Sequence, residues 1–551
     1  MKKSLCLIIC FALIILSLTG CQSQKSTPAT GSESSKQLAD EQILRLYMDN
    51  DPAGLDPQLC VDTNGGEILA YCTDALININ KEGKYEPALA QKWEVADDEK
   101  EYIFYLRDAK WSDGTPITAD DFYYSWMRAI DPKIQSGNAY RFFNIVGAED
   151  YFAGKLTDPA QVGIKVVDQK TFKVTLSRPT PYFMGLAVGN AFRPVKKDFV
   201  EKYGSEFAST PDKLMYSGPF KLSKWTRQQQ IVLEKNENHW NADNLKLQKI
   251  TYDIIQDPQV PLQMYQSGDL DVINLDASLL DKFRDSKELE TLLGTNIAFT
   301  SYNCKNEYFK NINIRKAFSM VLDRDTFTGK VLNNGAKPLR GYVPYGFPGG
   351  SNDKDFRSHN GDLIKDISKD NVAKEAQQLL DKGLLELGKT KEDLSKNASI
   401  LVFDEEGKKQ AQVMQQSYSK YFGVNVKIDQ ITLKVMIDRM FKGDYSMLII
   451  GYSGFYIDPM AYLENFTSDS PMNTSLWGNP KYDQLIKKAL EASGDERMDY
   501  LYEAEKMLMD EMPISPAYNR AYNFLTKPYV KGFERNPFYG SDINKVYIEK
   551  H

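Results

Sequence analysis

Residues 110–122 read Lys-Trp-Ser-Asp-Gly-Thr-Pro-Ile-Thr-Ala-Asp-Asp-Phe, and this stretch says more about the fold than any other. The pair Asp113-Gly114 is typical of a tight turn. Thr118 and the acids that follow it predict a helix start, because a hydroxyl caps the first turn and acids suit its positive end. Aromatic residues recur at helical spacing as far as Trp126. We therefore expect a turn that leads into a helix with an aromatic core face.

Strand and helix patterns alternate along the rest of the chain and predict a mixed α/β architecture. The 551 residues, 42% of them hydrophobic, are enough for a sizeable core and more than one domain. Short apolar or alternating runs predict strands at residues 102–106 and 171–176. Apolar residues at intervals of three to four predict helices at residues 314–322, 371–384, 408–421, 482–492 and 496–512.

The N-terminus has the pattern of an export signal. Lys2 and Lys3 precede an apolar run at residues 5–18, which is shorter than the roughly 20 residues of a spanning helix. The run closes on Leu-Thr-Gly-Cys21 and resembles a bacterial lipoprotein signal, in which residues 1–20 are removed and Cys21 is lipidated. An uncleaved membrane anchor is the alternative. Residues 21–39 are polar and predict a flexible tether between the lipid and the folded part.

Charge and cysteine content restrict the partners and the chemistry. A net charge of -7 argues against nucleic acid, and no pattern suggests a cofactor or a metal. After loss of the signal peptide, Cys60, Cys72 and Cys304 remain beside the lipidated cysteine. A bridge between Cys60 and Cys72 is one interpretation, and isolated small buried residues are the favoured one.

An enzyme is not expected, because the residues for common catalytic sites are missing. The chain has three histidines, His239, His359 and His551, and the last is its final residue. It contains no GxSxG, P-loop or HExxH motif. The pairs of acidic residues fall in helix or turn patterns that explain them structurally.

Residues 110–122, continued by Ala-Ile-Asp-Pro at 129–132, resemble the extracellular solute-binding proteins of the oligopeptide, dipeptide and nickel import class. Further matches follow in the order of that family, at residues 55–57, 86–94, 216–220, 265–271, 314–324, 451–459 and 470–474. The resemblance thus covers most of the chain after the predicted signal peptide.

The resemblance implies an α/β, two-lobed periplasmic-binding-protein-like fold of the class II type, with an additional small domain on the first lobe. Ligand lies between the lobes, which close around it. The implied division is signal peptide 1–20, tether 21–39, lobe I 40–72, small domain 73–196, lobe I again 197–298, lobe II 299–513 and a C-terminal return to lobe I 514–551.

The implied function is that of the substrate-binding component of an ABC importer. Such a protein binds oligopeptides, delivers them to permease and ATPase subunits, and acts as a lipid-anchored monomer on the extracellular face of the cell membrane. Two alternatives stay open. One is a receptor for another solute, such as a metal chelate or a sugar oligomer. The other is a receptor that senses a peptide pheromone.

By position in the family, two segments are expected as strands that face the ligand, with alternate side chains toward it. For each single residue, an ordinary packed strand position is the alternative. The implied ligand-binding residues are Cys60, Asp62, Thr63, Asn64, Gly451, Tyr452, Ser453, Phe455, Asp458 and Tyr518.

Phe455 departs from the family pattern. Several peptide receptors of the family carry an Asp at this place, which takes the α-amino group of the peptide because a buried ammonium needs a paired anion. Asp458 precedes Pro459 and is favoured as a structural turn acid. Either Asp62 on the opposite segment substitutes, or the ligand has no free amine in that pocket.

Overall fold

The computed structural model describes residues 37–352, 355–536 and 540–551. The predicted signal peptide, Cys21 and the tether up to residue 36 lie outside the described residues. Within the described ranges, no helix combines the length and the apolar composition needed to cross a membrane.

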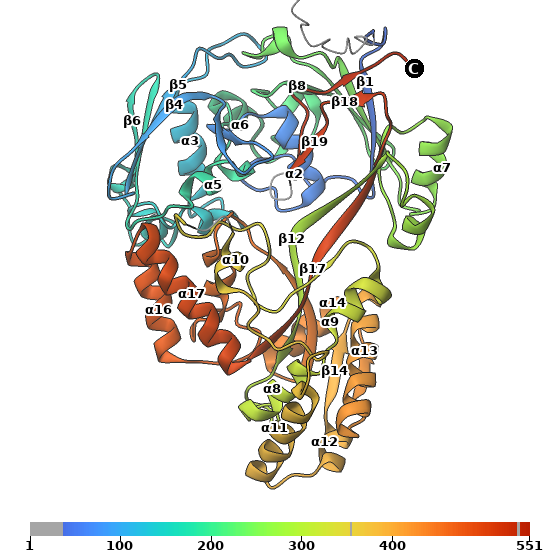
Figure 1. The fold of residues 1–551 in the computed structure, drawn as a ribbon. Helices are drawn as coiled ribbons and strands as arrows, with labels where there is room; N and C mark the ends of the chain where they lie inside the picture. Colours follow the sequence, from blue (N-terminus) through green and yellow to red (C-terminus); the bar gives the residue numbers. More distant parts are fainter. Residues whose placement is uncertain (1–36, 353–354, 537–539) are drawn as a thin grey trace, which may run out of the picture.

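Two halves are joined by long strands. The described residues form two four-stranded sheets and one seven-stranded sheet, besides two-stranded pairs. Figure 1 shows β12 (Leu289–Tyr302) and β17 (Ile514–Thr526) running between the upper and the lower half. The upper half contains lobe I and a small domain, and the lower half is lobe II. This is the two-lobed α/β architecture that we expected.

Lobe I is built on a sheet in which β1 pairs in parallel with β10 and the other pairs are antiparallel. Alternate residues of β1 are buried, because the sheet turns one face to the core. Helix α2 (Thr63–Cys72) packs against β8. In sheet order, the strands are β1 (Ile43–Met48), β10 (Lys249–Ile254), β9 (Gln230–Lys235) and β8 (Phe220–Thr226).

The small domain is an antiparallel sheet covered by α3 (Ala119–Ala129). Its strands, in sheet order, are β4 (Ala90–Val95), β5 (Glu101–Leu106), β7 (Thr171–Thr175) and β6 (Ile164–Asp168). The strand predictions at 102–106 and 171–176 are therefore confirmed to within one residue.

The stretch 110–122 forms the predicted turn and helix start. Gly114 has φ +86°, a left-handed conformation that favours glycine. Thr118 caps α3 in a capping box with Asp121, whose side chain accepts from the Thr118 N–H at 2.8 Å. Trp126 is fully buried, and its indole N–H donates to the carbonyl of Phe192 at 2.8 Å. The motif is thus structural and anchors the aromatic core of the small domain.

Lobe II is built on the large sheet, in the order β11-β17-β12-β16-β14-β15, with β13 paired to β17. Helices α13 and α14 follow strands of this sheet, and α16 packs against α17. The remaining strands are β11 (Val272–Asn274), β13 (Lys337–Pro338), β14 (Ser399–Val402), β15 (Lys427–Gln430) and β16 (Met447–Ser453).

The five predicted helices of this region are all present, and their ends differ from the predictions by no more than three residues. They are α8 (Ile312–Met320), α11 (Val372–Leu387), α13 (Glu405–Phe422), α16 (Pro480–Glu491) and α17 (Gly494–Glu511). The helix α14 (Leu433–Lys442) was not among the predictions.

The pairing of β12 with β17 shifts register at two places, between Leu293 and Ile297 and between Ala298 and Phe299. Asn519 of β17 is fully buried, and its side-chain amide donates to the carbonyls of Gly294 at 2.8 Å and Asn296 at 3.0 Å. The Asn519 amide thereby bonds to two carbonyls that lose their partners in the ladder where the register shifts. Asn519 therefore holds the bulge between the two lobes in one conformation.

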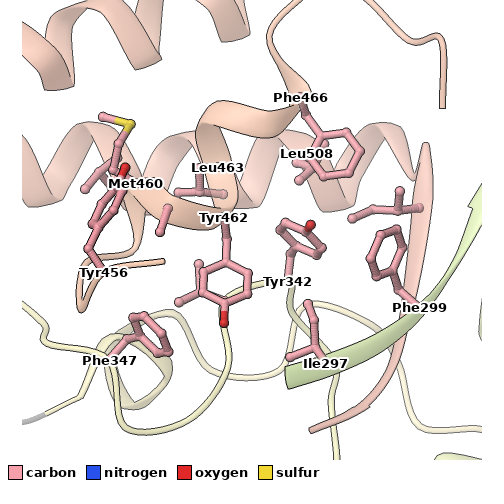
Figure 2. Packing of buried hydrophobic residues seen from close by; sticks show 14 of the residues in the cluster. Ile297, Phe299, Tyr342, Phe347, Tyr456, Met460, Tyr462, Leu463, Phe466 and Leu508 are labelled. Carbon is pink, nitrogen blue, oxygen red and sulfur yellow. The ribbon is translucent and has the colours of Figure 1, made fainter. Parts of the chain in front are cut away.

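Aromatic residues dominate the core of lobe II. Figure 2 shows Tyr342 beside Phe466 and Phe347 beside Tyr462, and both ring pairs meet edge to face with centroids 5.1 and 5.0 Å apart. The same buried cluster continues into the small domain as far as Trp126. Lobe II and the small domain therefore touch through packed side chains in this structure.

The cysteines are isolated, as the favoured interpretation has it, but only Cys72 is fully buried, while Cys60 and Cys304 are partly buried. Cys60, Cys72 and Cys304 are unbonded in the part of the chain that the structure describes. Burial raises the pKa of the Cys60 and Cys72 thiols to about 12 and that of Cys304 to about 11. The thiols are therefore protonated and poorly nucleophilic at neutral pH.

A buried ionic network ties α17 to the segment that precedes α11. Glu505 is completely buried, and its carboxylate accepts from Arg357 Nη1 at 2.7 Å, the Val343 N–H at 2.8 Å and the Asn360 amide at 2.7 Å. Arg357 is buried as well. Loss of one partner would leave the other charge buried without compensation.

We expect Glu505→Ala to lower the free energy of unfolding by about 3–5 kcal/mol, because it strands the Arg357 guanidinium. Urea unfolding followed by tryptophan fluorescence measures the change. Asp438→Ala is the control, since Asp438 and Lys442 form an exposed pair at 2.8 Å whose loss should leave the midpoint unchanged. Equal midpoints for the two variants would contradict the prediction.

Candidate functional site

A cavity of about 620 Å³ lies where lobe I faces the connecting strands. Helix α2 and β10 form one wall, and β12 and β17 form the other. A cavity of this volume is typical of a small-ligand site. From these four elements, the lining residues include Thr63, Gly66, Glu67, Tyr252, Leu292, Gly294, Tyr522 and Phe524.

Ionisable groups reach this cavity from both of its walls. The Glu67 carboxylate accepts from the Tyr252 hydroxyl at 2.7 Å, and burial raises the pKa of Glu67 while Arg535 lowers it. Arg535 also lines the cavity and forms an ion pair with Glu290. The cavity thus offers hydrogen-bond donors and acceptors beside aromatic side chains.

The expectation of a strand at residues 60–64 is wrong. Asp62 is the N-cap of α2, and its Oδ1 accepts from the Gly65 N–H at 2.8 Å. Asp62 is followed by Thr63 and Asn64, and an Asp at such a position favours the cap of a helix over an extended strand. Thr63 lines the cavity, whereas the Asn64 amide donates to Asp49 at 3.1 Å. The thiol of Cys60 lies 3.7 Å from Asp62 Oδ2.

The second expected segment is a strand through Ser453. Its residues Gly451, Tyr452 and Ser453 pair with β12 on one edge. On the other edge, β14 pairs only with Met447 and Leu448, so among the described residues no strand covers Ile449–Ser453. An uncovered edge presents main-chain groups that an extended ligand can pair with.

Phe455 lies two residues beyond β16 and is half exposed, at 51%. Its ring meets that of Tyr140 edge to face, with centroids 6.4 Å apart, and Arg141 lies 5.0 Å from the same ring. Sequence reasoning missed Tyr140 and Arg141, and nothing in their own stretch marked them.

The two expected segments meet at residues 138–141. The Asn138 amide donates to the Cys60 carbonyl at 2.9 Å, while Tyr140 and Arg141 contact Phe455. Val61 is exposed at 75% beside Gly137. The fold therefore brings the α2 segment and the end of β16 to opposite sides of one short segment of the small domain.

Asp458 lies apart from Phe455 and is buried. Its carboxylate accepts from Arg497 Nη1 at 2.9 Å and Nη2 at 2.7 Å, and also from the Met460 N–H at 2.9 Å. These are the contacts of a structural acid. It lines a separate cavity of about 690 Å³ between the small domain and lobe II.

Tyr518 is buried on β17, where its hydroxyl donates to Glu406. Glu406 also pairs with Arg520 at 2.6 Å. The aromatic residues of β17 that reach the cavity are Phe524 and Tyr522, and Tyr522 is 42% exposed. Sequence reasoning missed Tyr522, although the alternation of β17 places it on the same face as Tyr518.

Catalytic and metal-binding groups do not assemble in the described residues. No cluster of His, Cys, Asp and Glu there could hold a metal ion. His239 is buried and lies 2.8 Å from Asp74, whose carboxylate also accepts from the Trp240 indole at 2.8 Å. The arrangement explains His239 as a structural residue.

Comparison with known proteins identifies relatives along almost the whole chain. The model of "Bacterial extracellular solute-binding proteins, family 5 Middle" matches residues 84–474. The dipeptide-binding protein DppE of Bacillus subtilis is 34% identical, with 94% of each chain covered. The oligopeptide-binding protein OppA of the same species is 32% identical, with 97% of each chain covered.

Solved structures share the fold. That of Listeria monocytogenes OppA bound to peptide has a TM-score of 0.74 at 31% identity and covers 93% of this chain and all of its own. The pheromone receptor PrgZ has a TM-score of 0.76 at 30% identity, with the same coverage. The two-lobed periplasmic-binding-protein-like fold is thereby confirmed, and the chain is a binding protein, not an enzyme. It belongs to the bacterial extracellular solute-binding proteins of family 5.

Proposed function

We propose that this protein is the substrate-binding component of an ABC importer and that it binds oligopeptides between its two lobes. It acts as a monomer and delivers its ligand to permease and ATPase subunits. The observation that most directly supports a peptide is the uncovered edge of β16 at Ile449–Ser453, which ends beside the half-exposed ring of Phe455.

The names of the relatives support the same ligand class. Curated relatives include a dipeptide-binding and an oligopeptide-binding protein, and one solved relative, from Haemophilus influenzae, is in complex with the peptide RPPGFSPFR. An extended peptide that pairs through its main chain is held in a largely sequence-independent way. The cavity of about 620 Å³ then has room for varied side chains and water.

Closure of the cleft follows from the way the lobes are joined. The strands β12 and β17 connect the halves, and aromatic contacts cross from the small domain to lobe II. Tyr182 stacks on Tyr456 with ring centroids 4.2 Å apart. A peptide that fills the cleft adds contacts to both walls and stabilises the closed arrangement.

A mixture of peptides two to six residues long is expected to raise the Tm of the purified protein, because a ligand that binds the folded state stabilises it by mass action. Differential scanning fluorimetry measures the shift. Nickel chelates and sugar oligomers serve as comparison ligands. A Tm that responds to one of these and not to peptides would replace the peptide by that solute.

Pheromone sensing is the second candidate, favoured by the similarity to the receptor PrgZ. Deletion of the gene distinguishes uptake from sensing, because only loss of an uptake protein impairs growth on peptides. Deletion of the gene should abolish growth on peptides as the amino-acid source if the protein serves nutrition. Normal growth of the deletion strain would assign the protein to sensing.

We further propose that the protein is a lipoprotein held on the extracellular face of the cell membrane through Cys21. The signal-like residues 1–20 and the polar residues that follow support this proposal. The tether lets the folded part move while it stays near its permease.

Cys21→Ala is expected to shift the protein from the membrane fraction to the medium or the soluble fraction, because the lipid has no other attachment point. Immunoblots of fractionated cells and incorporation of labelled palmitate measure the change. Cys304→Ala is the matched control and should stay in the membrane. Membrane retention of the Cys21 variant without label would indicate an uncleaved signal anchor.

A further inference from the structure

Arg141 lies beside the end of β16 and contacts two aromatic rings. Its Cζ lies 5.0 Å from the ring centroid of Phe455 and 5.2 Å from that of Tyr140. Its Nε donates to Asn138 Oδ1 at 3.2 Å. Asn138 is itself buried and anchored to the Cys60 carbonyl at 2.9 Å. These contacts therefore restrict the position of the Arg141 guanidinium.

The positive charge of Arg141 has no partner within the described residues. No carboxylate there forms an ion pair with it, and its two Nη groups make no hydrogen bond to the protein. Contact with ring faces leaves the N–H groups at the edge of a guanidinium available. Those groups match the two oxygens of a carboxylate.

The acids on neighbouring elements are committed elsewhere. Asp56 accepts from Arg128 at 2.8 Å, and Asp62 caps α2 through the Gly65 N–H. Glu464 accepts from the Tyr456 hydroxyl at 2.8 Å, and burial raises its pKa. This end of the cleft thus presents an excess of positive charge beside half-exposed aromatic rings.

We propose that Arg141 is a specificity-determining residue that binds a carboxylate of the ligand beside Phe455. The proposal rests on peptide binding as the function and adds the chemical group that this end of the cleft selects. An ammonium there would face the guanidinium without a compensating acid, and a neutral group would leave its N–H donors unpaired. The carboxylate comes either from the peptide C-terminus or from an acidic side chain.

Four tetrapeptides with the same free N-terminus distinguish these sources. One pair of alanine and leucine peptides ends in a carboxylate or in an amide. The second pair is amidated and carries a glutamate or a glutamine at the third position. Isothermal titration calorimetry at neutral pH should give about tenfold tighter binding for the charged member of at least one pair, and the pair that responds names the source.

Arg141→Gln should abolish this preference, and Arg141→Lys should restore part of it because it keeps the charge. Arg227→Gln is the matched control, since Arg227 stacks at 3.4 Å on the Trp225 ring in the β8–β9 turn. A wild-type protein that binds the members of both pairs equally, or a preference that survives in Arg141→Gln, overturns the inference. Failure of all four peptides to bind the wild-type protein overturns peptide binding itself.

Discussion

Every other feature of the molecule depends on how β12 and β17 pass between its halves. They pair along most of their length, and β17 pairs at one end with β11 while β12 pairs at the other with β16. The ladder shifts register twice, and the buried Asn519 amide fixes the shift between Leu293 and Ile297 by two hydrogen bonds. The same bulge contributes Gly294 to the cavity, and a side chain there would collide with the Tyr522 ring at 2.4 Å. The irregular part of the β12–β17 pairing therefore both connects the two lobes and lines the cavity.

Three acids at or beside the expected site residues are engaged within the protein. Asp458 is bound to Arg497, Asp62 to the start of α2 and Glu406 to Arg520. Their carboxylates are thus engaged within the protein. In the proposed binding mode, recognition rests on main-chain edges, aromatic rings and the Arg141 guanidinium.

Local signals in the sequence predicted the fold well. Turn and cap residues in 110–122 act over a few positions, and their contacts are present as expected. Ordered matches along the chain predicted a strand at residues 451–455, and β16 ends there at Ser453. The expectation of an extended conformation at Asp62, which the resemblance implied, was wrong. Asp62 caps a helix instead, as its local sequence favours.

Contacts between distant segments could not be predicted in this way. Tyr140 and Arg141 become part of the candidate site only because the small domain contacts the end of β16. Neither the hydrophobic periodicity nor the composition of residues 138–141 indicates this contact. Tyr522 was within reach, since burial alternates along β17 from Asn519 to Thr526. Tyr518 was chosen instead, and its position is buried.

The uncovered edge of β16 also has a cost outside recognition. Strand edges with free main-chain groups are templates for association between chains, and proteins commonly blunt them with lysine, proline or a covering element. Residues Ile449–Ser453 carry neither lysine nor proline. No other strand among the described residues covers this edge. A peptide that pairs with it, as proposed, would therefore also shield it from association with a second chain.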